Sequence, residues 1–219
     1  MIQKTIKQLD DLLYTKLIDE RYLHTGTTAV CVVYDSKYQA LYFANLGDSR
    51  GILIRDNQLV FSTVDHKPET ESEYERIIKI GGQVVSNRVN GALAVSRAFG
   101  DFNLKARMIA KQRCIWNPDN LELVLSEAEI SLIPKTSMGE DMVICLACDG
   151  VFDVCSNEEV TEFVSSSMGA GKSLLDTSKR LVQHCFDKKS TDNISVIRMA
   201  YFLVSQFYGY FGGIKSLKF

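Results

Sequence analysis

The sequence has no excess of charge of either sign and no long hydrophobic run. Its 219 residues include 25 lysines and arginines against 27 aspartates and glutamates, which gives a formal net charge of −2. This balance offers no broad cationic face for nucleic acid or anionic lipid. No segment approaches the roughly 20 apolar residues that span a bilayer, and residues 1–20 lack the apolar core of a signal peptide. We therefore expect an intracellular protein, cytoplasmic and/or nuclear, that binds neither nucleic acid nor membrane.

A disulfide framework is also lacking, although the chain has six cysteines. Most of them lie within apolar segments of strand-like or helix-like pattern, so we interpret them as reduced thiols. Cys145 and Cys148 form a C-x-x-C at the end of the run MVICLAC, and we interpret this pair as buried packing rather than as a redox motif. No C-x5-R loop is present, so no cysteine is expected to act as a nucleophile on phosphate. The cysteines are at positions 31, 114, 145, 148, 155 and 185.

The chain does have enough apolar residues to bury a substantial core. Hydrophobic residues make up 46% of a length that is typical of one domain. Neither an internal repeat nor a linker-like or low-complexity segment interrupts it. We therefore expect a single domain over residues 1–219, and we expect it to be a monomer.

Helical periodicity appears in four segments. At the start of the chain, apolar residues recur every three or four positions and predict an amphipathic helix over 2–20. Later helices are predicted at 69–80, where Gly81 and Gly82 provide a C-cap, at 157–167, and at 173–187. Asn157 is the predicted N-cap of the third helix. The apolar stripe of the first helix consists of Ile2, Ile6, Leu9, Leu13 and Leu17.

Short β-branched and aromatic runs predict strands between these helices. The runs within 29–61 are interpreted as an antiparallel meander, and their near-continuous hydrophobicity indicates that both faces of the sheet are covered. Together with the helices, this indicates a layered α/β (α+β) fold. Residues 100–125, which contain Trp116 and Pro118, are interpreted as a flap-like insertion, and 201–219 as an aromatic C-terminal tail. Further strands are predicted at 83–85, 91–96, 121–125, 129–133, 142–148 and 194–202.

Four aspartates lie at or near the ends of predicted strands. Asp149 directly follows the run MVICLAC, and Asp192 lies just before the run ISVIRMAYF; Asp153 and Asp48 could extend the same acidic cluster. Carboxylate oxygens are the ligands that Mg²⁺ and Mn²⁺ prefer. The plainer interpretation is that each aspartate belongs to an ordinary turn. Spacing alone does not show that the four converge, so both interpretations stay open at this level.

Seven strings of the sequence follow one another in an order that is typical of one enzyme family. They resemble the successive motifs of the PPM, or type 2C, metal-dependent serine/threonine protein phosphatases, over about residues 26–200. The strings are GTTAV (26–30), ANLGDSRG (44–51), DHKPET (65–70), ERIIKIGG (75–82), RVNGALAVSRAFGD (88–101), ACDGVFDV (147–154) and TDNISVI (191–197).

The resemblance implies a four-layer αββα sandwich of two antiparallel sheets flanked by helices. It also implies hydrolysis of phosphoserine and phosphothreonine in phosphoprotein substrates by a cation-activated water, with two Mg²⁺ or Mn²⁺ ions as cofactors. By this resemblance Asp149 and Asp192 would ligate metal, and Asp48 and Asp153 would help to hold a third ion found in some members. Arg97 and Asp101 could equally be substrate contacts or structural partners of other residues.

The sequence departs from the family pattern before Gly26. Members carry an early basic and acidic segment and then a DGHGG string, and no counterpart of either is found here. The bridging aspartate, the phosphate-binding arginine and the histidine proposed as general acid are therefore missing, so the catalytic residues are unknown. His24 is no substitute, since an exposed histidine before a strand is the commoner case. We expect an N-terminally truncated domain. It would be either a fragment of an active phosphatase or an inactive pseudophosphatase that acts as a protein-binding module.

A nucleotide-binding loop is excluded as a rival. The string GAGKS at 169–173 imitates the end of a P-loop, but Ser166 stands where that motif needs glycine. The preceding text EEVTEFV is typical of a helix, whereas a P-loop follows a strand.

Overall fold

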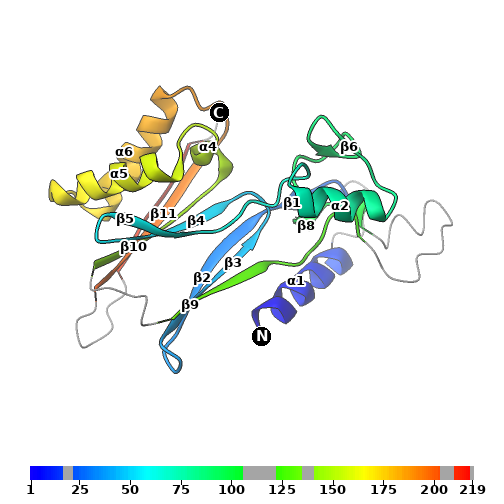
Figure 1. The fold of residues 1–219 in the computed structure, drawn as a ribbon, viewed down its shortest axis with the longest axis horizontal. Coiled ribbons are helices and arrows are strands. Elements are labelled where there is room, and N and C mark those ends of the chain that lie inside the picture. Colours follow the sequence, from blue (N-terminus) through cyan, green and yellow to red (C-terminus); the bar gives the residue numbers. More distant parts are fainter. Residues whose placement is uncertain (17–21, 106–121, 135–140, 203–209, 218–219) are drawn as a thin grey trace. The chain divides into compact units, whose positions relative to one another are not determined.

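The computed structural model describes residues 1–16, 22–105, 122–134, 141–202 and 210–217 (Figure 1). Predictions that fall on 17–20 or on 106–121, including Cys114, Trp116 and Pro118 in the flap-like insertion, lie outside the described residues. The chain divides into two compact units, which are described separately. Unit 1 comprises Met1–Ala29, Ala44–Asp48 and Asp65–Ile130, and unit 2 comprises Val30–Phe43, Ser49–Val64 and Ser131–Phe219. Within the described ranges, no helix has the length and apolar character needed to cross a membrane.

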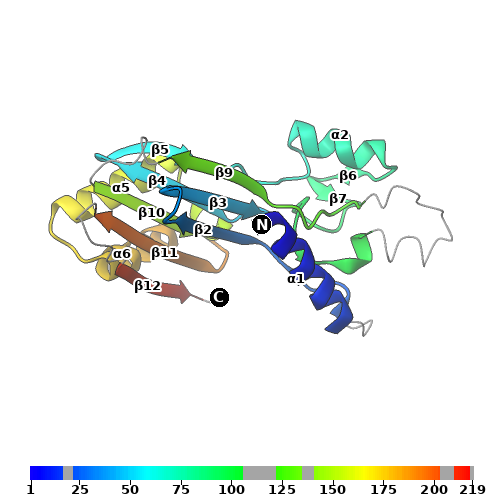
Figure 2. The ribbon, with the colours of Figure 1, turned by 90° about the horizontal axis from the view of Figure 1, so that it is seen from below.

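Most of unit 2 is built on a five-stranded sheet in the order β12-β11-β10-β4-β5, with each neighbouring pair antiparallel (Figure 2). A second, three-stranded sheet has the order β2-β3-β9. The strands of the first sheet are β4 (Arg50–Arg55), β5 (Gln58–Ser62), β10 (Asp141–Ala147), β11 (Ile194–Phe202) and β12 (Tyr210–Leu217), and those of the second are β2 (Ala29–Asp35), β3 (Ala40–Leu46) and β9 (Glu129–Pro134).

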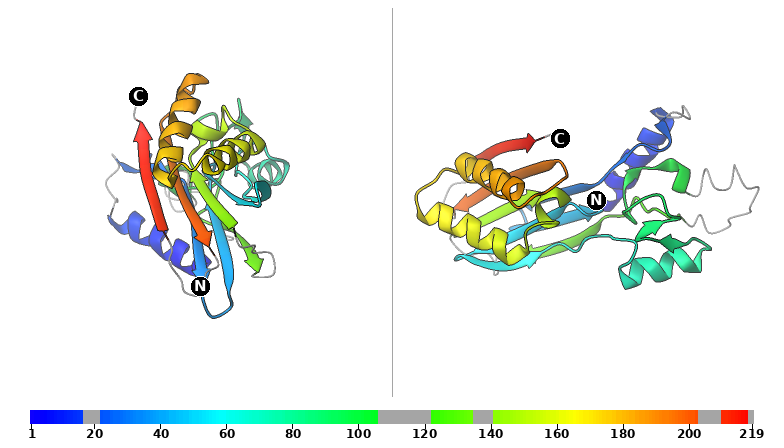
Figure 3. Two further views of the ribbon diagram at one scale, coloured as in Figure 1. Left: turned by 90° about the vertical axis from the view of Figure 1, so that its left-hand side faces the viewer. Right: turned by 90° about the horizontal axis from the view of Figure 1, so that it is seen from above.

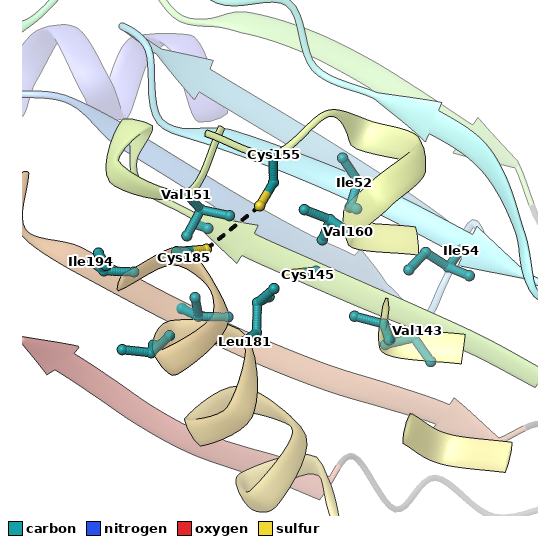
Figure 4. Close-up of a cluster of buried hydrophobic side chains, with 14 residues drawn as sticks. Ile52, Ile54, Val143, Cys145, Val151, Cys155, Val160, Leu181, Cys185 and Ile194 are labelled. Atoms are coloured by element: carbon teal, nitrogen blue, oxygen red, sulfur yellow. Dashed lines mark hydrogen bonds between the residues drawn. The ribbon is translucent and has the colours of Figure 1, made fainter. Parts of the chain in front are cut away.

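Alternation along the central strands places apolar side chains on both faces of the five-stranded sheet. On one face, Ile52 and Cys145 are fully buried in a core shared with the helices α5 (Asn157–Gly169) and α6 (Leu174–Asp187) (Figures 3 and 4). On the other face, Leu53 packs with Phe43 of the three-stranded sheet. Two sheets face to face with helices outside one of them confirm the predicted α+β sandwich class.

Serine residues cap the two long helices of this unit. Ser156, and not Asn157 as the sequence predicted, is the N-cap of α5, where its hydroxyl accepts from the backbone N–H of Glu159 at 3.1 Å. The Glu159 carboxylate in turn accepts from the Ser156 N–H at 2.8 Å, which completes a capping box. Ser173 caps α6 through the N–H of Asp176. The prediction missed Ser156 because Asn157 is an equally good capping residue.

Arg198 of β11 is a fully buried cation beneath α6. Its Nη2 donates to the carbonyl oxygen of Leu174 at 2.6 Å, and both Nε and Nη2 donate to the hydroxyl of Ser178 at 3.1 Å. Burial lowers the pKa of Arg198 to about 10, so the guanidinium still carries its charge at neutral pH. These hydrogen bonds tie the first turn of α6 to the strand below it.

The described residues of unit 1 form the helices α1 (Ile2–Lys16) and α2 (Glu71–Lys79), together with very short stretches of paired or 3-10 structure. Ile2, Ile6 and Leu13 of α1 pack against a small core, as the stripe predicted. Leu9, however, is exposed and Asp10 is buried. The Asp10 carboxylate accepts from Nζ of Lys105 at 2.8 Å and from the N–H of Gly100 at 2.9 Å, so this ion pair replaces an apolar contact. The short elements are β1 (Gly26–Thr27) with β8 (Phe99–Gly100), β6 (Val84–Val85) with β7 (Arg88–Val89), and the 3-10 helix η2 (Phe102–Leu104).

Three strand predictions need correction. The runs within 29–61 are not one meander, since β3 and β4 belong to different sheets. Residues 91–96 and 122–125 make only isolated bridges, between Val89 and Leu93 and between Arg97 and Leu125. Part of the predicted C-terminal tail, by contrast, forms β12 at the edge of the five-stranded sheet.

Candidate metal centre

The ends of β10 and β11 bring Asp149 and Asp192 into the same small region of unit 2. Ala147, the last residue of β10, is paired with Val196 of β11. Beyond this pair, the backbone N–H of Cys148 donates to the carbonyl oxygen of Ser195 at 3.2 Å. Asp149 then begins the short helix α4 (Asp149–Phe152), while Asp192 lies two residues before β11. The two carboxylates, 43 positions apart in the sequence, therefore flank one sheet end.

Glycine at position 150 allows α4 and the segment before β11 to approach closely. A β-carbon placed on Gly150 would lie 2.4 Å from the carbonyl oxygen of Asn193 and 3.5 Å from the β-carbon of Asp192. The Ser190 hydroxyl donates to the Gly150 carbonyl oxygen at 2.7 Å and fastens the same two segments. Any larger residue at position 150 would push Asp149 and Asp192 apart.

Each of the two carboxylates is oriented by a hydrogen bond from the backbone N–H of the residue that follows it. Oδ1 of Asp149 accepts from the N–H of Gly150 at 2.9 Å, and Oδ1 of Asp192 accepts from the N–H of Asn193 at 2.6 Å. Asp149 is half-buried, whereas Asp192 is exposed. The plainer interpretation of these residues as turn formers therefore describes their geometry as well, and it is compatible with a second role as ligands.

Cys148 lies beside both carboxylates, and the sequence interpretation of its side chain as core packing was wrong. Its Sγ donates to the carbonyl oxygen of Asn193 at 3.0 Å and accepts from the N–H of Ser195 at 3.1 Å. Burial raises the pKa of the Cys148 thiol, and the nearby charges of Asp149 and Asp192 raise it further. Cys145, by contrast, is fully buried in the core, as predicted.

The other two predicted ligands have different surroundings. Asp153 is exposed one helical turn after Asp149, and its N–H donates to the Asp149 carbonyl oxygen at 2.8 Å. Asp48 is a buried residue of unit 1, where its carboxylate is ion-paired with Lys67. Among the residues that the structure describes, no three His, Cys, Asp or Glu side chains gather closely enough to hold a metal ion.

Comparison with known families decides the classification. The family pattern described as protein phosphatase 2C matches residues 1–194. The chain belongs to the protein phosphatase 2C family. The match covers α1, the first six strings that the sequence interpretation used, and the first four residues of the seventh.

Curated relatives in this family are longer than the chain. Protein phosphatase 1B of Bos taurus is 43% identical over 178 residues, which are 81% of this chain and 34% of that protein. Protein phosphatase 1A of Homo sapiens is 42% identical over 178 residues, which are 81% of this chain and 44% of that protein. The chain therefore spans between about a third and a half of these 2C relatives.

Solved structures share the 2C fold. A phosphatase from Toxoplasma gondii superimposes with a TM-score of 0.73 at 23% identity, over 99% of this chain and 77% of that one. A structure described as a C. elegans sex determining protein gives a TM-score of 0.72 at 26% identity, over 90% and 45% of the two chains. These likenesses agree with the α+β sandwich described above.

Arg97, the second arginine of the longest 2C string, is ion-paired with a carboxylate of unit 1. Its Nε donates to Oε1 of Glu73 at 3.0 Å, and its Nη1 donates to the carbonyl oxygen of Glu127 at 3.1 Å. Nη2 of Arg76 donates to the other Glu73 oxygen at 2.9 Å. Asp101, which ends that string, is buried, and burial raises its pKa to about 6. For Arg97 these contacts favour a structural role over a substrate contact.

Proposed function

We propose that the chain hydrolyses phosphoserine and phosphothreonine in proteins, and that Asp149 and Asp192 hold a divalent cation, Mg²⁺ or Mn²⁺, for this reaction. The observation that carries the proposal is the close approach, at Gly150, of the two segments that bear these carboxylates at one end of the β10–β11 pair. Membership of the 2C family and the names of its relatives, protein phosphatase 1A and 1B, support the reaction class.

The chemistry of this corner suits a hard cation. Asp149 and Asp192 supply carboxylate oxygens, and the exposure of Asp192 leaves room for water and for a phosphate group. When bound, the cation would activate a water molecule and neutralise phosphate oxygens. The chain itself orients the carboxylates through the N–H groups of Gly150 and Asn193. The Cys148 thiol donates to the Asn193 carbonyl oxygen, and we do not propose it as a nucleophile.

Asp153 is proposed as an accessory ligand of this ion, and Asp48, which belongs to unit 1, is kept as a separate proposed metal ligand. Asp153 lies one turn from Asp149 on an exposed surface and would join the same ion with little rearrangement. Asp48 would first have to exchange its ion pair with Lys67 for a cation. We assign no general acid and no phosphate-binding arginine.

The alternative function is that of a protein-binding module, either a pseudophosphatase or a fragment without activity of its own. The finding that no three potential ligands gather within the described part of the chain favours this alternative. Two carboxylates alone form an open site that would bind a cation weakly.

A turnover assay combined with a metal titration separates the two functions. The purified chain is assayed with Mn²⁺ on p-nitrophenyl phosphate and on a phosphothreonine peptide, and Mn²⁺ binding is measured by isothermal titration calorimetry. We expect Asp149→Ala and Asp192→Ala to abolish both signals. Asp187→Ala, an exposed acid at the end of α6, serves as the matched control and should leave both unchanged.

Turnover that survives both substitutions would overturn the proposed role of these carboxylates. Mn²⁺ binding that depends on Asp149 and Asp192 but is not accompanied by turnover would instead support the binding module.

A further inference from the structure

Two adjoining hollows lie between α5 and the turn that joins β4 to β5, all within unit 2. Their volumes are about 570 and 540 Å³, and both are lined by Asn57 and Ser165. Because they share these two residues, they form one groove along the side of α5. Helix residues from Glu158 to Met168 line it, which corresponds to a length of about 15 Å.

The floor of the groove is apolar, and its rim is acidic. Leu59 of the hairpin and Met168 of α5, both half-buried, supply accessible hydrocarbon surface, whereas Ile54 and Val164, which also line the hollows, are buried. The carboxylates on the rim are those of Glu158, Glu162 and Asp56, and that of Asp56 is ion-paired with Arg55 at 3.7 Å. Among the described residues that line either hollow, none is a lysine or an arginine.

Glu158 and Glu162 have no counter-charge in the described part of the chain, whereas Glu159 has one. Both are exposed and lie four positions apart, so they are neighbours on one face of α5 and repel each other slightly. Glu159, on a different face of α5, is ion-paired with Lys188 at 2.7 Å. The side of α5 that borders the groove therefore carries the unpaired charges of Glu158 and Glu162 beside the half-buried apolar side chains of Leu59 and Met168.

We propose that this groove binds a segment of another protein that presents a lysine or arginine next to an apolar side chain. The cation would pair with Glu158 and Glu162, and the apolar side chain would fill the hollow over Leu59 or Met168. A groove about 15 Å long accommodates four or five residues of extended chain at about 3.3 Å per residue. The acidic rim disfavours nucleic acid and anionic lipid. This docking function goes beyond phosphate hydrolysis and needs neither metal nor turnover.

The site is tested with a phage-displayed library of twelve-residue peptides selected against the whole chain without metal. We expect the selected peptides to combine basic and apolar residues. One selected peptide, labelled with fluorescein, is then titrated by fluorescence anisotropy. The double variant E158K/E162K should raise its Kd about tenfold, since two ion pairs are replaced by repulsion, and added salt should weaken binding to the unsubstituted chain.

E71K/E75K is the matched control. Glu71 and Glu75 are also exposed, and they also lie four positions apart in the first two turns of a helix, α2. This variant should leave the Kd unchanged. Thermal unfolding followed by circular dichroism establishes that both double variants are folded.

Selected peptides without basic residues, or a Kd that E158K/E162K leaves unchanged, would overturn the proposal. Self-association of the chain in sedimentation velocity that E158K/E162K abolishes would assign the groove to a second copy and would equally overturn it. Since every readout is binding, loss of phosphatase activity in the Asp149→Ala test leaves this result unaffected.

Discussion

Gly150 and Asn193 are in such close backbone contact that the first of them has no room for a side chain. A β-carbon at Gly150 would lie 2.4 Å from the Asn193 carbonyl oxygen, well inside van der Waals contact. The same approach brings Asp149 and Asp192 to one sheet end, so the stability of the chain and the geometry of the candidate metal centre depend on one position.

Gly150→Ala is expected to lower the free energy of unfolding by about 1–3 kcal/mol, because the backbone at residues 149–150 or 192–193 must shift. Urea unfolding followed by circular dichroism measures the change. Gly169→Ala is the control, since nothing lies within 4 Å of its added β-carbon at the end of α5. That substitution should be neutral or stabilise by up to about 1 kcal/mol. Equal effects of the two substitutions would contradict the role given to Gly150.

The ion pairs of Glu73 predict a dependence of stability on acid pH. Burial raises the pKa of Glu73, but hydrogen bonds from Arg97 and Arg76 outweigh it and lower the pKa from 4.5 to about 2. Its contribution, of the order of 3 kcal/mol, is present above pH 4.5 and is lost as the pH falls towards 2. Glu73→Gln should therefore lower the free energy of unfolding at pH 7. This gap, the difference in free energy of unfolding between the variant and the unsubstituted chain, should narrow between pH 5 and 3.

Urea unfolding at several pH values measures this gap. Glu75→Gln, an exposed acid on the same helix, is the control and should show no such narrowing. A gap for Glu73→Gln that stays constant with pH would mean that the Glu73 carboxylate has an ordinary pKa.

The buried Asp101 predicts a pH dependence of stability that is opposite in sign to that of Glu73. Burial raises its pKa from 3.8 to about 6, so the folded chain keeps this proton longer than the unfolded chain does. The contribution of Asp101 is therefore most favourable below pH 3.8, and up to about 3 kcal/mol of it is lost as the pH rises through 6. Asp101→Asn, which tolerates the left-handed φ of 47° at this position, should be progressively more stable than the unsubstituted chain between pH 4 and 7. Unfolding curves over that range check the trend, and a flat difference would contradict it.

Thiol labelling tests the burial of the cysteines. In a Cys114→Ser background, the exposed Cys31 should react first with Ellman's reagent, followed by the half-buried Cys148. Cys145, Cys155 and Cys185 should react only on unfolding, because their side chains are buried. The absorbance of the thiolate released from the reagent, measured before and after denaturant is added, separates the accessible thiols from the buried ones. Fast reaction of all five thiols in the native chain would contradict the packing shown in Figure 4.

The elements that the sequence predicted well are those whose pattern is long and repeated. The strand predicted at 194–202 matches β11, and the helix at 173–187 begins only one residue before α6, whose N-cap is Ser173. Both patterns are decided by burial on the core side, which hydrophobic periodicity reports directly. The segment 91–96 failed because its apolar residues pack as a looped chain around a turn at Gly91, whose φ is +70°.

The candidate site was only partly predictable. Asp149 and Asp192 were singled out because each adjoins a buried strand, but only the resemblance joined them, since the pairing of β10 with β11 is a long-range contact. Cys148 was missed because an apolar run hides its position as the N-cap of α4. Asp10 was missed because its partner, Lys105, lies 95 residues away. The local sequence pattern around a residue carries no information about contacts with residues so far away in the sequence.

The buried guanidinium of Arg198 determines how the whole of α6 is aligned on β11. Its acceptors, the Leu174 carbonyl oxygen and the Ser178 hydroxyl, lie on the inner side of α6. Hydrophobic contacts alone would allow α6 to shift along the strand at little cost in free energy, because the hydrophobic effect is not directional. The Arg198 guanidinium can donate to both of these oxygens in one alignment of the two elements only. Arg198 therefore fixes the position of α6 along β11.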